Sequence, residues 1–290
     1  MKKTTIFLLI IFFSGIVASG QEMTAYKLYN NKGKAIDYSK LVRQASEADV
    51  VLFGELHNNP ICHWLQLELS RSLYDVKKQD LVMGAEMFES DNALLISEYL
   101  SGLVKDKNFE SEARLWSNYK TDYKPLLQFA RDSSVVFVAT NIPRRYASLV
   151  NRNGFEGLEA LDEEARSYIA PLPVPYDPEL PGYKSMLEMM EGSGGHGNDN
   201  LPKAQAIKDA TMAYSISRNI SAGKLFLHFH GTYHSDNYEG IVWYLKQYKP
   251  DLKIVTISSC EQTNLESLAE ENNNKADFIL VVPESMTKTH

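Results

Sequence analysis

The chain has 290 residues, of which 44% are hydrophobic and 23% are charged, with a formal net charge of −7. The apolar content is sufficient for a globular core, in one large α/β domain or two smaller ones. The acidic balance argues against a nucleic-acid-binding protein, which requires a basic face.

Residues 1–20 have the pattern of a secretory signal peptide. Two lysines precede an apolar stretch over residues 6–17, and the small residues 18–20 provide a cleavage site before Gln21. We therefore expect residues 21–290 to form a single exported domain, in the periplasm or at the cell surface. No cysteine follows the apolar stretch, so a lipobox cysteine is absent from this site. An uncleaved anchor is the alternative, although the stretch is short for a span of about 20 residues.

Six apolar runs predict buried strands. They are continuous rather than alternating, as in strands covered on both faces, and lie at 48–56, 80–88, 134–142, 224–231, 253–260 and 277–283. Helical patterns separate most of them, including residues 60–78, 91–104, 123–131 and 239–248. This alternation predicts a three-layer α/β fold with a mostly parallel central sheet flanked by helices.

Residues 155–222 interrupt the alternation. Five prolines fall within residues 171–181, which excludes regular structure there. A Met-rich helical segment, a glycine-rich loop and a long helix from residue 201 to 220 follow. We expect a helical, proline-rich insertion over the carboxyl ends of the strands, where ligands of such sheets bind. A disordered linker is the alternative, but the aromatic and apolar content of residues 168–190 disfavours it.

Three of the predicted strands pass through a glycine and end on a carboxylate or an imidazole. A glycine at such a position permits a sharp turn or the close approach of another group. Because the side chains of Glu55 and His57 are two residues apart, they project to the same side of an extended chain. With Glu86 and His234 they would form one polar cluster. Burying such ionisable groups together costs free energy, so the cluster indicates a function. The four could provide an acid and a base, ligate a divalent metal, or hold one another in place.

Further histidines and arginines are weaker candidates. His228 and His230 alternate along one strand, and at least one is expected to be a hydrogen-bonded core histidine. Arg144 and Arg145 open a helix, whose N-terminus is a natural anion site; solvated arginines are the alternative. His196 lies in the glycine-rich loop, where a surface histidine is the alternative.

The two cysteines, Cys62 and Cys260, are expected near the same rim of the sheet. We expect two buried thiols, and one disulfide, which export to an oxidising compartment would permit, is the alternative. The sequence has no G-x-S-x-G, Walker, G-x-G-x-x-G, H-E-x-x-H or C-x-x-C motif. The absence of these motifs disfavours the common classes of serine hydrolase, nucleotide-binding protein and thiol-redox protein.

Residues 51–60, Val-Leu-Phe-Gly-Glu-Leu-His-Asn-Asn-Pro, resemble the opening motif of the ChaN-like haem-binding family in the Tiki/TraB/erythromycin-esterase superfamily. Further similar motifs follow in order, at residues 84–88, Trp116, 123–126, 129–131, 141–144, His196, Gln205, 209–213 and 231–234. The resemblance covers roughly residues 48–250. Asn58 replaces an aspartate of many relatives, which removes one carboxylate from the site.

The resemblance implies an α/β fold with a helical insertion, and haem binding in bacterial iron uptake. It also implies outer-membrane haem-uptake components as partners and pairing of two haems across a homodimer interface. Haem requires an axial Tyr, His, Met or Cys, an apolar slot and cations for its propionates. We therefore expect Tyr176, Tyr183 and His196 at the haem, with Arg144 and Arg145 near the propionates. A plain core is the alternative for the aromatic and methionine side chains.

Three functional hypotheses follow. The first is an exported haem-binding protein of an iron-acquisition system. The alternative is a hydrolase in which Glu55, His57, Glu86 and His234 activate water, directly or on a divalent metal. The third is an α/β binding protein whose ancestral site has decayed.

Overall fold

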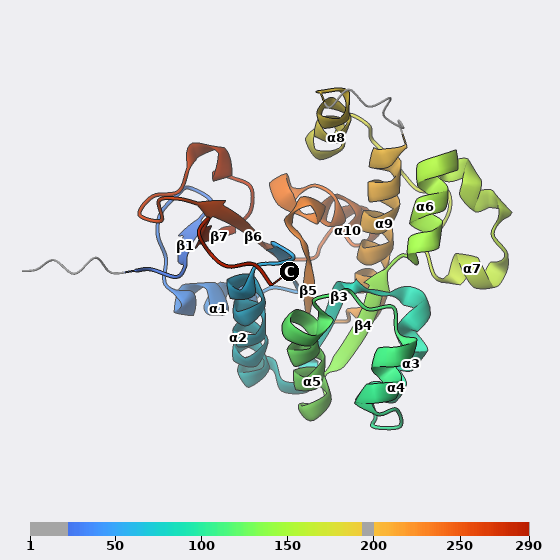
Figure 1. The fold of residues 1–290 in the computed structure, drawn as a ribbon, viewed down its shortest axis with the longest axis horizontal. Helices are drawn as coiled ribbons and strands as arrows, with labels where there is room; N and C mark the ends of the chain where they lie inside the picture. The colour runs from blue at the N-terminus through green and yellow to red at the C-terminus, as the bar shows by residue number, and fades with distance from the viewer. Residues whose placement is uncertain (1–22, 193–199, 290) are drawn as a thin grey trace, which may run out of the picture.

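The computed structural model describes residues 23–192 and 200–289, so the predicted signal peptide and His196 lie outside the described residues. Its strands are β1 (Lys27–Asn30), β2 (Val50–Glu55), β3 (Leu81–Glu89), β4 (Val136–Asn141), β5 (Leu225–Gly231), β6 (Ile254–Gln262) and β7 (Phe278–Pro283). They form one sheet in the order β1-β7-β6-β2-β5-β3-β4 (Figure 1). Every described pair is parallel except β1 with β7. The predicted fold class is confirmed.

Helices cover both faces of this sheet (Figure 1). They are α1 (Tyr38–Ser46), α2 (Pro60–Lys77), α3 (Ala93–Leu100), α4 (Asp106–Glu112), α5 (Lys124–Asp132), α6 (Arg144–Asn153), α7 (Glu163–Ser167), α8 (Pro181–Gly192), α9 (Leu201–Asn219) and α10 (Ile241–Tyr248). One core lies between the sheet and α1, α2, α3 and α5. A second lies between the opposite face and α6, α9 and α10. Within the described part of the chain, no helix is both long and apolar enough to cross a bilayer.

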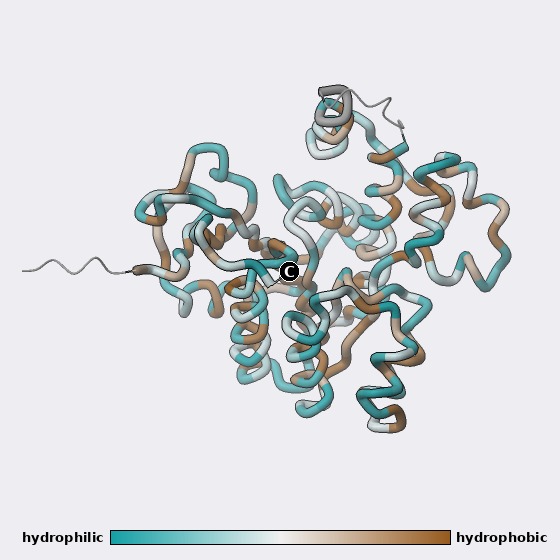
Figure 2. The backbone as a smooth tube through the Cα atoms, viewed as in Figure 1, coloured by the Kyte–Doolittle hydropathy of each residue, from teal (hydrophilic) through white to brown (hydrophobic). Residues whose placement is uncertain are grey.

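The alternation of side chains along β2 explains the two cores. Val51 and Phe53 pack toward α2, whereas Val50 and Leu52 pack toward α9 and α10. All four are fully buried, as a strand covered on both faces requires. In Figure 2 the central strands are largely brown, while the helices alternate between teal and brown along their length. That alternation is typical of helices with one apolar face.

Two elements differ from the sequence prediction. Strand β1 was not predicted, because its four residues add only a short antiparallel edge. The predicted helix over residues 91–104 is shorter: α3 ends at Leu100, and Gly102 adopts φ 79° just beyond it. A glycine in this left-handed conformation commonly terminates a helix.

The region 155–222 contains two kinds of element. Helix α9 packs against β4, α6 and α10, so it belongs to one of the helical layers. Helix α8 projects away from the layers (Figure 1), and its Met186 lines a cavity at the strand ends. This part of the insertion covers the carboxyl ends of the strands, as the sequence predicted.

Candidate functional site

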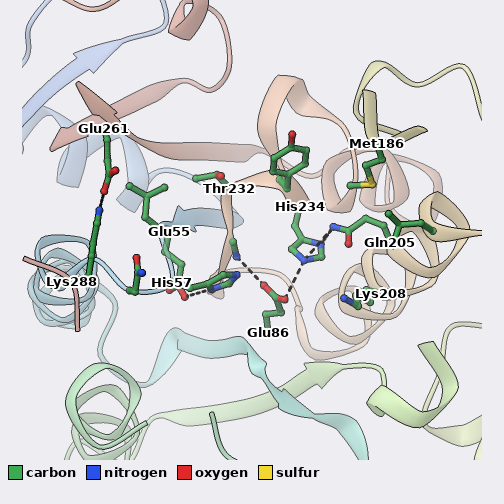
Figure 3. Close-up of a pocket in the computed structure, with 15 residues that line it drawn as sticks. Glu55, His57, Glu86, Met186, Gln205, Lys208, Thr232, His234, Glu261 and Lys288 are labelled. Carbon is green, nitrogen blue, oxygen red and sulfur yellow. Dashed lines mark hydrogen bonds and ion pairs between the residues drawn. The ribbon is translucent and has the colours of Figure 1, made fainter. Parts of the chain in front are cut away.

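A cavity of about 950 Å³, hereafter the strand-end cavity, lies at the carboxyl ends of the central strands (Figure 3). Its volume is within the range of small-molecule and cofactor sites. Residues from β2, β3, β5 and β6, from the segments after β2, β5 and β7, and from helices α8 and α9 line it: Glu55, Leu56, His57, Asn58, Glu86, Met186, Leu201, Gln205, Lys208, Gly231, Thr232, Tyr233, His234, Glu261 and Lys288. The four residues of the predicted polar cluster are all among them.

Glu55 is buried and fully satisfied by neighbouring donors. Gln66 and the Tyr123 hydroxyl donate hydrogen bonds to it, and Nδ1 of His57 lies 2.9 Å from Oε1. Burial raises the pKa of Glu55, but the charge of His63 and the contacts with His57 and Tyr123 outweigh it and lower the pKa. Glu55 is therefore a fixed acceptor that orients the imidazole of His57.

His57 presents its ring to the cavity. Its side chain is 45% exposed, and its outer face contacts Trp116 edge-on, with 4.9 Å between ring centroids. Burial lowers the pKa of His57, whereas the hydrogen bond with Glu55 and the charge of Glu86 raise it above the ordinary value. A Cβ atom added at Gly231 would lie 2.6 Å from Nε2 of His57. Glycine at this strand end therefore permits a close approach, one of its two predicted roles.

His234 is locked between two carboxylates. Its Nε2 lies 3.2 Å from Oε1 of Glu86, and its Nδ1 bonds Asp209. Burial lowers the pKa of His234, but the two carboxylates raise it to about 10, so the ring is an imidazolium at neutral pH. Conversely, the charge of His234 and the N–H of Gly231, 2.9 Å from Oε2, lower the pKa of Glu86 despite its burial.

The four cluster residues form two separate ion pairs instead of one shared group. His57 uses Nδ1 for Glu55, and His234 uses both ring nitrogens for carboxylates. Across the described residues, no three His, Cys, Asp or Glu side chains are placed to hold one metal ion. The arrangement therefore does not provide the divalent-metal centre that was one alternative for Glu55, His57, Glu86 and His234.

The predicted haem tyrosines lie behind the cavity wall. Tyr183 is buried, and its hydroxyl donates a 2.8 Å hydrogen bond to Oδ2 of Asp209. Tyr176 stacks on Tyr183 at a centroid separation of 5.6 Å. Neither residue lines the strand-end cavity. Tyr183 instead supports the carboxylate that binds His234.

The predicted propionate-binding arginines already have carboxylate partners. Arg144 Nε lies 2.7 Å from Glu89, and Arg145 pairs with Asp91. Arg144 also lines a second cavity of about 410 Å³, which shares His57 with the strand-end cavity. The structure therefore places Arg144 beside the site and Arg145 outside both cavities.

His228 and His230 are fully buried core histidines, which confirms the prediction for them. Thr140 donates its hydroxyl to the carbonyl of Ala85, so it accepts from Nε2–H of His228, 2.7 Å away. Nδ1 of His228 then accepts from Nδ1–H of His230 at 3.1 Å, and Nε2 of His230 accepts from Ser235 at 2.8 Å. Burial lowers the pKa of both rings, and both are neutral and satisfied.

Several residues in or beside the cavity had no role predicted for them. Asp209 lies within a buried stretch of α9, where a lone acid among alanines and isoleucine is a usable signal of a buried pair. Tyr233 lies next to His234, within the motif at residues 231–234, so its place at the cavity could have been predicted. Glu261 and Lys288 carry no comparable local signal, since chain topology brings them to the cavity. Cys62 and Cys260 are both free thiols, as expected; Cys62 is buried and Cys260 is partly buried.

Comparisons with known proteins agree with this architecture. A family model described as "Haem-binding uptake, Tiki superfamily, ChaN" matches residues 41–245. ChaN of Campylobacter jejuni, described with cofacial haem binding, superposes with a TM-score of 0.68 and 18% identity, over 90% of this chain and 98% of that one. A succinoglycan biosynthesis protein superposes with a TM-score of 0.50 and 11% identity, over 84% and 90% of the two chains. These superpositions show a shared fold. No curated protein matches the sequence.

Proposed function

The chain belongs to the ChaN family of haem-binding uptake proteins in the Tiki superfamily, and from this premise we propose that it binds haem in the strand-end cavity. The cavity volume of about 950 Å³ suits a cofactor of this size class. Apolar side chains and cations both border it, including Leu56, Met186, Leu201, Lys208 and Lys288. A lining of apolar side chains with lysines at its edge fits a flat apolar ligand that carries carboxylates.

Two side chains are suited to hold the iron. Tyr233 is 53% exposed, and phenolate is an established axial ligand of haem. His57 is oriented through Nδ1 by Glu55, as metal-ligating imidazoles usually are by a carboxylate. His234 is excluded from this role because both of its nitrogens are engaged. When bound, haem would supply the iron chemistry, and the protein would supply ligation, orientation and charge.

The test is a titration of hemin into the purified protein, followed by the Soret band. We expect saturable binding at micromolar hemin. Leu201→Trp should weaken it by narrowing the cavity, whereas Leu94→Trp should not, because Leu94 is an exposed helical leucine outside the cavity. Tyr233→Phe and His57→Ala would separate the two iron ligands by their spectra. No saturable Soret change in the unmodified protein would reject the proposal.

We further propose that the protein is exported and serves haem or iron acquisition, with outer-membrane uptake components as partners. The lysines and apolar stretch of residues 1–20 support export, and family membership supports the uptake role. Fractionation of cells that produce the full chain tests the location. Light scattering with and without hemin tests whether a homodimer forms.

A second candidate function is metal-free hydrolysis. The observation in its favour is the oriented Glu55–His57 pair beside a cavity, an arrangement suited to a general base. An ester and peptide substrate panel, compared with His57→Ala, tests it. Turnover that is absent from the unmodified protein, or unchanged in the variant, would reject it.

A further inference from the structure

Segment 284–289, which follows β7, contributes Lys288 to the lining of the strand-end cavity. Its Thr289 donates from N–H to the carbonyl of Asn58 at 2.9 Å and from its hydroxyl to Asp122 at 2.9 Å. Of these two anchors, Asn58 lines the cavity next to His57, and Asp122 is buried. The segment is therefore fixed at the mouth of the site, and Lys288 precedes the anchored residue.

The ammonium group of Lys288 already has a carboxylate partner in this structure. It forms an ion pair with Glu261 from β6, and both residues line the strand-end cavity. Figure 3 shows this pair at one end of the lining residues, with Lys208, Gln205 and Met186 at the other end. Lys208 has no ion pair among the described residues. Of the two cavity lysines, Lys288 is thus the one whose surroundings already accommodate a carboxylate.

The Lys288–Glu261 pair is also the exchangeable ion pair of the cavity. Its side chains are 33% and 30% exposed, whereas those of His234 and Glu86 are 5% and 8% exposed. A partly exposed pair gains little net stability, because solvent screens it and both side chains lose freedom. A ligand carboxylate can therefore replace Glu261 at small cost, and Glu261 can turn to solvent. Breaking the buried pair would leave a charge unpaired.

We propose that Lys288 binds a carboxylate of the ligand and that Glu261 holds this position when the ligand is absent. The inference rests on the proposed function, in which the ligand carboxylate is a haem propionate. Both residues lie beyond residues 41–245, the part matched by the family model, so this recognition belongs to the rest of the chain. Thr289 supports it, because the anchored segment positions the ammonium group before the ligand arrives.

The test compares hemin with hemin dimethyl ester, which lacks free carboxylates, by Soret titration of the full chain. Lys288→Ala should weaken hemin binding by about tenfold, the scale of one charge-assisted hydrogen bond. Lys288→Ala should not change the affinity for the diester. Lys288→Arg should retain most of the affinity for hemin. Glu261→Gln should raise the affinity for hemin by several-fold and leave that for the diester unchanged, because the carboxylate that competes for Lys288 is removed. Glu284→Gln is the matched control, since that neighbouring carboxylate accepts from Thr263 and does not line the cavity.

The possible failures are distinct. If the unmodified protein binds neither porphyrin, the proposed function fails and this inference fails with it. If hemin binds but Lys288→Ala has the affinity of the unmodified protein, only the inference fails. The inference also fails if Lys208→Ala weakens the binding of hemin but not of the diester, and Lys288→Ala weakens neither. The ligand carboxylate would then lie at the Lys208 end of the cavity. Circular dichroism of each variant excludes loss of fold as the cause.

Discussion

Two strands of the sheet, β2 and β3, each carry a carboxylate paired with a histidine, yet the two pairs have opposite character. In the Glu55–His57 pair the histidine is 45% exposed and has one acidic partner. In the Glu86–His234 pair the histidine is 5% exposed and lies between two carboxylates. The same residue types therefore produce one imidazole that can meet a ligand and one that is a buried structural cation. Exposure and the number of charged partners decide the difference.

The largest expected difference between the pairs is in stability. His234→Ala would leave Glu86 and Asp209 buried without their cation, so we expect a loss of about 3–5 kcal/mol. His57→Ala should cost about 1 kcal/mol, because Glu55 keeps its bonds from Gln66 and Tyr123. Urea unfolding of both variants measures the two losses. Equal losses would show that the contrast in burial has no energetic consequence.

The buried pair should also set the alkaline limit of stability. Folding raises the pKa of His234 from 6.5 to about 10, so the folded protein binds the extra proton within that window. The contribution of His234 is complete below pH 6.5 and is lost as the pH rises toward 10. The free energy of unfolding should fall by at most about 1.4 kcal/mol per pH unit. Urea titrations from pH 6 to 10 measure it, and a flat profile would contradict an imidazolium at His234.

A smaller effect is expected from the support of Asp209. Tyr183→Phe removes a buried hydrogen bond to a carboxylate, which should cost about 2 kcal/mol. Tyr176→Phe is the matched control, because this stacked neighbour makes no hydroxyl hydrogen bond to described residues. Thermal unfolding of the two variants is the measurement. If Tyr176→Phe loses as much stability as Tyr183→Phe, the hydrogen bond from Tyr183 to Asp209 is not the source of the loss.

The smallest stability change should come from Gly231→Ala, which acts on the exposed pair. The added Cβ would lie 2.6 Å from Nε2 of His57, so the imidazole must move. His57 is partly exposed and can give way, so we expect a stability loss of no more than about 1 kcal/mol. Hemin binding should nevertheless weaken by several-fold. Unchanged hemin affinity together with an unchanged Soret spectrum would show that the position of His57 does not matter for the ligand.

Local patterns in the sequence were sufficient for the fold. The six continuous apolar runs correspond to β2 through β7, because strands buried on both faces tolerate few polar residues. The polar cluster could also be predicted, since parallel strands place their carboxyl ends at one edge. Strand β1 could not, because four residues with two buried side chains carry too little pattern.

The functional details depended on contacts that no local pattern encodes. Tyr183 was predicted as a haem residue from its place in the insertion, but its hydroxyl is committed to Asp209. Arg144 and Arg145 were predicted near propionates, but Glu89 and Asp91 already bind them. In each case the partner lies at least 26 residues away in the chain. Such pairings arise from the topology and become visible only in three dimensions.

The most direct test of the central claim is the position of the iron in the protein–hemin complex, located by anomalous X-ray scattering from crystals. We predict an iron atom inside the strand-end cavity, within reach of Tyr233 or His57. Iron bound elsewhere, with the cavity between Glu86, Met186 and Lys288 unfilled, would contradict the account.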